Sequence, residues 1–217
     1  MSNYKIGFIG SGKMATAIAA GLVNQKVFQA SEVIASDISE ESLKYFSEKC
    51  GADTCTDNAK VVAEASTVIL AVKPQMAEVV CADLEISPET HVISIAAGLK
   101  IASLDKWLNT KKITRVMPNT PLMVGMGASA YCCSGAVSSE EKHLVESIFG
   151  CAGVIKAVEE KDIDAVTGVS GSGPAYVFEF IEALALAGEK NGLDYETSLS
   201  LATQTVAGAA EMISQKM

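Results

Sequence analysis

The segment that most constrains the fold lies close to the N-terminus. Lys5–Ile9 is a short apolar segment that predicts a strand, and a glycine turn follows it directly. Gly10 permits a tight turn that a side chain would block, and Gly12 lets the backbone approach a pyrophosphate. Ala15, in place of a third glycine, is small enough for the next helix to pack against the strand. The pattern predicts a dinucleotide site at a helix N-terminus, although a strand-to-helix turn without a ligand has the same form.

Strand-like and helix-like segments alternate from this point to about residue 158. An alternation of this kind is typical of a parallel, doubly wound sheet, so we expect an α/β, Rossmann-like domain over residues 1–162. The later strands are expected at Glu32–Ser36, Ala52–Cys55, Thr67–Val72, Val92–Ile95, Lys112–Met117, Ala128–Cys133 and Gly153–Val158, and the helices at Glu40–Cys50, Asn58–Ala65, Gln75–Leu84, Ile101–Leu108 and Ser138 to about Phe149.

Residues 163–217 have a different character, because strand signals disappear and apolar residues recur at helical spacing. Pro174 suits the first turn of a helix that Gly192 ends, and Asp194 is placed to cap a second helix. We therefore expect an all-helical second domain. Its last helix carries an apolar seam typical of helix–helix contact, formed by Leu199, Ala202, Val206, Ala209 and Ile213.

Composition narrows the classes of partner and the compartment. The chain has 17 basic and 26 acidic residues without a basic run, so we expect neither nucleic acid nor a membrane surface as a partner. We find no apolar run of about 18 residues and no signal peptide, and the six cysteines form no CxxC pair. We expect reduced thiols in a cytoplasmic protein, and no metal site because only two isolated histidines are present.

Four further segments have residue types that suggest a binding site, and three of them lie at strand ends, where open α/β sheets place ligands. Ala71–Pro74, Ser94–Gly98 and Met117–Pro121 each follow a predicted strand, and Gly168–Tyr176 is a glycine-rich turn that leads into a helix. Three of them also have a purely structural interpretation: Lys73 as a solvated loop residue, Asn119-Thr120 as turn chemistry alone, and the glycine-rich turn as a tight helix entry.

Together with the N-terminal segment, these sequences resemble the delta-1-pyrroline-5-carboxylate reductase family. GFIGSGKMA, AVKP, SIAAG, MPNTP and GVSGSGPAY are similar to its successive signatures, in the same order along the chain. The resemblance implies hydride transfer from NADPH or NADH to the C5 imine carbon of 1-pyrroline-5-carboxylate, which gives L-proline. It also implies a Rossmann domain followed by a helical dimerisation domain, and a homodimer or higher homo-oligomer.

The resemblance also assigns residues to the site. No residue is an evident acid or base, so catalysis is expected to depend on alignment of the hydride donor and the imine. The substrate-cleft candidates are Asn119, Thr120, Ser170, Gly171, Ser172 and Gly173. The cofactor-binding candidates are Ile9, Gly10, Ser11, Gly12, Met14, Ser36, Asp37, Asn58, Ala71, Val72, Lys73, Ala96, Ala97 and Gly98.

Ser36 and Asp37 predict opposite cofactor preferences. An acid in the position of Asp37 usually bonds the ribose 2′-hydroxyl of NADH and repels a 2′-phosphate, whereas Ser36 offers a hydroxyl that a phosphate accepts. We therefore expect both cofactors to bind.

The chain departs from the family at its C-terminal end. Members continue into an SPGGTT-type loop that holds the substrate, so we expect these 217 residues to be a truncated version that binds dinucleotide but lacks turnover. Two other interpretations stay open: a non-catalytic, oligomerising dinucleotide-binding fragment, and a β-hydroxyacid-type dehydrogenase. The helix after Pro174 has no lysine before Lys190, which argues against the dehydrogenase.

Overall fold

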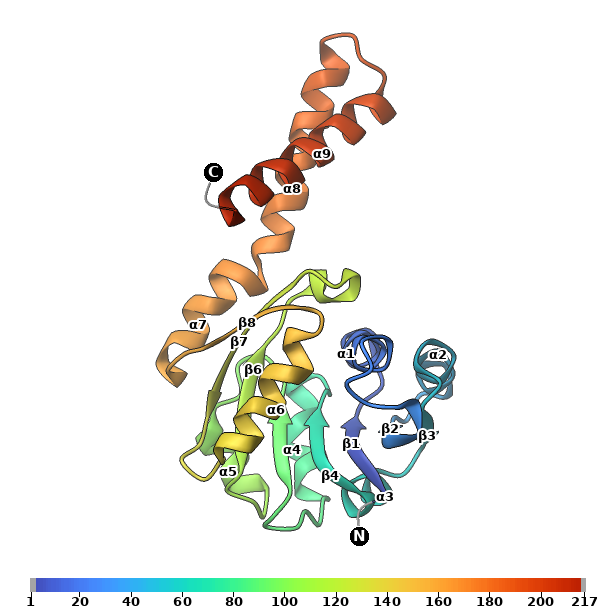
Figure 1. The fold of residues 1–217 in the computed structure, drawn as a ribbon, viewed down its shortest axis with the longest axis vertical. Coiled ribbons are helices and arrows are strands. Elements are labelled where there is room, and N and C mark those ends of the chain that lie inside the picture. The colour runs from blue at the N-terminus through green and yellow to red at the C-terminus, as the bar shows by residue number, and fades with distance from the viewer. Residues whose placement is uncertain (1–2, 216–217) are drawn as a thin grey trace. The chain divides into compact units, whose positions relative to one another are not determined.

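In a computed structural model of the chain, which describes residues 3–215, the strands form one sheet in the order β3-β2-β1-β4-β5-β6-β7-β8 (Figure 1). The strands are β1 Tyr4–Ile9, β2 Val33–Ser36, β3 Asp53–Cys55, β4 Ala65–Leu70, β5 His91–Ser94, β6 Ile113–Met117, β7 Gly127–Cys133 and β8 Gly153–Ala157. The helices around them are α1 Lys13–Asn24, α2 Glu40–Cys50, α3 Asn58–Glu64, α4 Pro74–Ala82, α5 Ile101–Trp107, α6 Ser139–Gly150 and α7 Ile163–Val166. The predicted alternation is therefore confirmed, with most bounds shifted by only one or two residues.

The sheet is parallel from β3 to β6, as predicted, but β7 runs antiparallel to β6. The predicted parallel, doubly wound sheet is confirmed for the other strand pairs, and the β6–β7 pair departs from it. A parallel neighbour needs a crossover of about a dozen residues or more, usually a helix. Residues 118–126 provide only a short connection with the 3-10 turn η2 (Thr120–Val124), so the chain reverses. Helix α6 then supplies a true crossover, and β8 is parallel to β7.

The sheet separates two apolar cores, one on each face. Alternate residues of a strand point to opposite faces, so Phe8 packs with Phe46 of α2 in one core and Ile9 packs in the other. The first core collects α1, α2 and α6, and the second collects α3, α4 and α5. This doubly wound arrangement leaves the carboxyl ends of the parallel strands as one edge that the helices do not fill.

Local capping signals fix where the helices begin. The Asp57 side chain accepts a hydrogen bond from Ala59 N at the start of α3. Ser138 and Glu141 form the predicted capping box at the start of α6. These bonds satisfy backbone donors that a helix leaves unpaired, which is why the sequence placed both starts correctly.

The chain divides into two compact units, the first ending at Gly171 and the second beginning at Ser172. The 3-10 turns η1 (Ala30–Glu32) and η3 (Glu160–Asp162) and the π-helical turn η4 (Thr167–Gly171) belong to the first unit. The second consists of α8 (Gly173–Lys190) and α9 (Tyr195–Ser214), which pack against each other. Their contact is close: Ser198 Oγ donates to the Ala185 carbonyl at 2.7 Å, and a Cβ added to Gly188 would overlap the Ser198 hydroxyl.

Candidate cofactor and substrate site

The glycine turn lies where the chain order of the sheet reverses, between the ends of β2 and β4. Gly10 N donates to Ser36 O at 2.8 Å, and Ala71 N donates to Ile9 O at 2.8 Å. Gly10 has φ +96°, and an added Cβ would lie 2.9 Å from the Ala71 carbonyl oxygen. Only glycine suits this position, because it accepts a positive φ and has no Cβ.

Gly12 provides the approach to an anion. A Cβ added to Gly12 would meet nothing within 4 Å, and this residue is the N-cap of α1. No side chain caps α1 and no acid lies in its first turn, so its first N–H groups have no side-chain partner. Open space in front of uncapped N–H groups fits the pyrophosphate of a nicotinamide dinucleotide.

Beside this turn, the adenosine-side candidates form a hydrogen-bonded group. Ser36 is fully buried, and its hydroxyl lies 2.7 Å from Asn58 Oδ1 and 3.3 Å from the Phe8 carbonyl. The half-buried Asp37 carboxylate accepts from Ser11 N at 2.8 Å and from Ser11 Oγ at 3.2 Å. The sequence did not reveal that Asp37 bonds to the glycine turn, because 26 residues separate the two partners.

The nicotinamide-side candidates follow β4 and β5 at the same edge. Lys73 is the exposed N-cap of α4, whereas Ala71 and Val72 are half-buried. After β5, Ala96 is buried while Ala97 and Gly98 are exposed, and Gly98 has φ +78° with open space where a Cβ would lie. These small residues leave room beside the backbone for a flat ring.

Asn119 and Ser170 are brought together at the end of β6. Asn119 Nδ2 donates to the Ser170 carbonyl at 3.0 Å, and Asn119 Oδ1 accepts from Ala128 N at 2.9 Å. Only 7 % of Asn119 is exposed, so both ends of its amide are used inside the protein. Thr120, the next residue, is exposed at the start of η2 and has a free approach to solvent.

The turn η4 carries the remaining first-unit candidates. Ser170 Oγ donates to Val166 O at 3.2 Å, and a Cβ added to Gly171 would lie 2.6 Å from Met117 Cε. Single π-helical turns are rare in proteins as a whole, and those that occur are often found at functional sites. Ser172 and Gly173 belong to the second unit, where they form the N-terminus of α8.

The buried cysteines of the first unit supply no thiolate. Burial raises the pKa of the thiols of Cys50, Cys81 and Cys132 to about 11, so these thiols stay protonated at neutral pH. Among residues 3–215, no three His, Cys, Asp or Glu side chains gather as a metal site would require. In the same residues, no helix has the length and apolar character of a membrane span.

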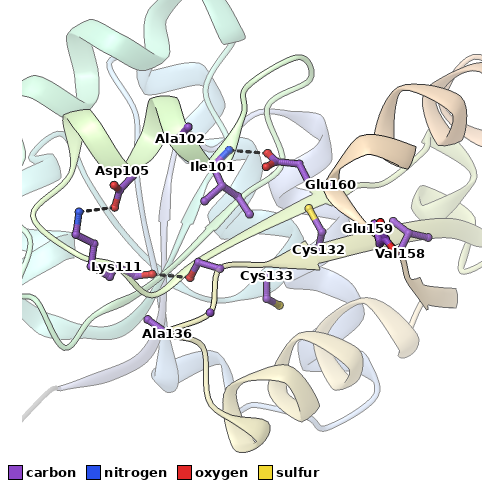
Figure 2. Close-up of a pocket in the computed structure, with 12 residues that line it drawn as sticks. Ile101, Ala102, Asp105, Lys111, Cys132, Cys133, Ala136, Val158, Glu159 and Glu160 are labelled. Atoms are coloured by element: carbon purple, nitrogen blue, oxygen red, sulfur yellow. Dashed lines mark hydrogen bonds and ion pairs between the residues drawn. The ribbon is translucent and has the colours of Figure 1, made fainter.

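The sequence did not predict a cavity of about 730 Å³ that none of the candidate residues lines (Figure 2). It lies between α5, the end of β7 and the segment before η3, with Cys132 in its wall. Figure 2 shows Glu160 reaching Ile101, whose N–H it accepts at 2.7 Å; the same oxygen pairs with Arg115 Nη1 at 2.8 Å. Neither Glu160 nor Arg115 lies in a recognisable sequence motif.

Two family models match the chain. Residues 5–98 match "NADP oxidoreductase coenzyme F420-dependent", and residues 160–217 match "Pyrroline-5-carboxylate reductase dimerisation".

Individual proteins match over nearly the whole chain. The chain is 42% identical to a pyrroline-5-carboxylate reductase of Glycine max over 98% of its own length and 78% of that protein. A solved pyrroline-5-carboxylate reductase of Coxiella burnetii is similar at a TM-score of 0.90 and 38% identity, over 99% of this chain and 81% of the other. The Plasmodium falciparum pyrroline carboxylate reductase solved with NADP bound has a TM-score of 0.86 and 36% identity, over 99% and 80%.

Proposed function

Because the chain belongs to the pyrroline-5-carboxylate reductase family, we propose that it is an NAD(P)H-dependent oxidoreductase that reduces the imine of 1-pyrroline-5-carboxylate to L-proline. The observation that carries this proposal is the glycine turn at the reversal point of the sheet. There Gly10 is restricted to glycine, and Gly12 opens onto uncapped N–H groups. Those features are what a dinucleotide-dependent reductase requires of its fold.

The candidate residues divide into cofactor and substrate groups. Dinucleotide binding is assigned to residues 1–162 and dimerisation to residues 163–217, in keeping with the dimerisation model that matches residues 160–217. A bound NADH or NADPH supplies the hydride. The backbone of the glycine turn holds its pyrophosphate, and the small residues after β4 and β5 leave space for its nicotinamide.

Asn119 acts by positioning. Its Oδ1 accepts from Ala128 N and its Nδ2 donates to the Ser170 carbonyl, so it holds the turn η4 in place. Thr120 keeps an exposed side chain at the same strand end and is the better candidate for a direct substrate contact. With no acid or base among these substrate-side groups, the chain accelerates the reaction by aligning the hydride donor with the imine. An iminium substrate protonated in solution needs no protein acid.

The second unit supports association with a second copy. Large apolar side chains are exposed along both helices: Tyr176, Phe178, Phe180 and Leu184 on α8, and Leu201, Met212 and Ile213 on α9. An exposed apolar surface of this kind marks an interaction site. We assign it to a homodimer interface because the matched family model describes dimerisation.

A cytoplasmic location is part of the proposal. All six cysteines are free thiols, which persist in a reducing compartment.

A spectrophotometric assay tests the function. NADH and NADPH oxidation is followed after addition of 1-pyrroline-5-carboxylate, both for these 217 residues and for the chain extended at its C-terminus to the length of its relatives. Substrate-dependent oxidation by either version supports the proposal. If both versions bind dinucleotide but neither oxidises it with substrate, the non-catalytic interpretation replaces the reductase.

A further inference from the structure

We propose that this chain binds NADH more tightly than NADPH because Asp37 occupies the donors that a 2′-phosphate would need. This proposal rests on the proposed function, since it concerns the adenosine end of the same cofactor site. From the sequence alone, Ser36 and Asp37 predict opposite cofactor preferences, and the proposal decides between them.

The first observation is the placement of the Asp37 carboxylate. One oxygen accepts from both Ser11 N and Ser11 Oγ, at 2.8 and 3.2 Å, and the other accepts from Ser39 N at 2.9 Å. The carboxylate is therefore held between the glycine turn and the start of α2. A carboxylate at the end of the second strand is placed to accept hydrogen bonds from ribose hydroxyls.

The second observation is that the Ser36 hydroxyl is not available as a donor to a 2′-phosphate. Ser36 is fully buried, and its hydroxyl hydrogen has two internal acceptors, Asn58 Oδ1 at 2.7 Å and the Phe8 carbonyl at 3.3 Å. A buried hydroxyl that already donates inside the protein cannot also donate to a phosphate in solvent. Ser36 therefore supports the end of β2 and does not favour NADPH.

The third observation is the charge of the loop. The segment from Ser36 to Ser42 contains three acids, Asp37, Glu40 and Glu41, and no lysine or arginine. Lys44, the next cation along the chain, lies 3.9 Å from Glu48, one turn further along α2. A 2′-phosphate placed here would meet like charges and no cation from this segment, and the energy of that repulsion grows as the charges approach.

Lys13 is the other cation to consider, because it follows the glycine turn. It is exposed at the start of α1, and no ion pair joins it to Asp37 among residues 3–215. If Lys13 recruited a 2′-phosphate, replacing it would weaken NADPH binding selectively. It therefore needs its own variant in the test.

The test measures binding rather than turnover. Calorimetric titration compares ADP-ribose with 2′-phospho-ADP-ribose, which lack the nicotinamide, and NADH with NADPH. We expect the form without the 2′-phosphate to bind about tenfold tighter in each pair, and the ratio to shrink at high salt as the repulsion is screened. Asp37→Ser and Asp37→Asn are expected to bring the two affinities within about threefold of each other.

Two control variants test whether a change in the ratio of affinities comes from Asp37 itself or from any change of charge on the surface. Asp57→Asn removes one negative charge at the cap of α3 without touching Ser11, so we expect it to keep the wild-type ratio. Lys13→Ala is also expected to keep it. Circular dichroism confirms that each variant folds.

The selectivity proposal would be overturned if the wild-type chain bound both members of a pair equally, or bound the member with the 2′-phosphate more tightly. It would also be overturned if both Asp37 variants kept the wild-type ratio of affinities. None of these results would affect the reductase proposal. Failure of all four ligands to bind the wild-type chain would overturn the dinucleotide site, and with it both proposals.

Discussion

The Asn119 side chain donates to the Ser170 carbonyl at 3.0 Å, across 51 residues of sequence. The same amide accepts from Ala128 N at 2.9 Å. One buried side chain therefore joins the end of β6, the start of β7 and the π-helical turn η4. Its two partners are backbone groups, so no other side chain in the sequence indicates this link.

We predict that Asn119→Ala lowers the free energy of unfolding by about 3 kcal/mol, because it leaves the Ser170 carbonyl and the Ala128 N–H without their partner. Urea unfolding followed by circular dichroism measures the change. Asn191→Ala is the matched control: the Asn191 amide donates to Ala187 O at an exposed position, and its loss should cost less than about 0.5 kcal/mol. Equal losses in the two variants would contradict a special role for Asn119.

The Gly12→Asp variant is predicted to lose dinucleotide affinity by about a hundredfold or more while keeping its fold. The new Cβ meets nothing within 4 Å, but the carboxylate would stand in front of the α1 N–H groups and repel a pyrophosphate. Calorimetric titration with NADH and NADPH measures the loss. Gly135→Asp adds the same charge at another open glycine and should leave affinity unchanged. Undiminished binding by Gly12→Asp would exclude the glycine turn as the cofactor site.

Local signals explain how much of the fold the sequence predicted. Helix α2 has the predicted bounds Glu40–Cys50, because Ser39 caps its first turn and Gly51, at φ +67°, ends it. The antiparallel β7 was missed because strand direction depends on the length of the preceding connection, which the alternation of strands and helices does not record.

The candidate site also has one part that the sequence predicted and another that it did not. The positions of Gly10 and Gly12 follow from local backbone requirements, so a motif predicts them. The engagement of Ser36 by Asn58 and of Asp37 by Ser11 depends on contacts over 22 and 26 residues, which only the folded chain establishes. Sequence reasoning therefore predicted the glycine turn as a cofactor site but not the hydrogen bonds that join its neighbours.

His91 is predicted to make stability fall in mild acid. Burial lowers its pKa from 6.5 to about 4, and its Nε2 lies 2.8 Å from Thr114 Oγ1. Between these two values the unfolded chain takes up a proton that the folded chain resists. Stability is therefore fully present above the unfolded pKa and is lost as the pH falls below it.

Between about pH 7.5 and pH 5 the loss from His91 should be about 2 kcal/mol, measured by urea unfolding. His91→Gln cannot titrate and should flatten the dependence in that interval. His143→Gln is the control, because His143 is exposed on α6 and has only a half-exposed partner, Glu146. A dependence that survives in His91→Gln would assign the proton uptake to another group.

The last prediction concerns self-association through α8. The Phe178 side chain is 64% exposed, so Phe178→Glu should leave a single chain folded while placing a charge in the apolar surface that a second copy covers. Light scattering over a range of concentrations should give at least twice the 22.6 kDa of one chain for the wild type, and a shift toward 22.6 kDa for the variant. Tyr45→Glu removes an exposed aromatic ring from α2 and should associate like the wild type. A wild-type chain that stays monomeric at every concentration would contradict the assignment of this surface to a homodimer, and an unaltered mass for Phe178→Glu would place the interface elsewhere.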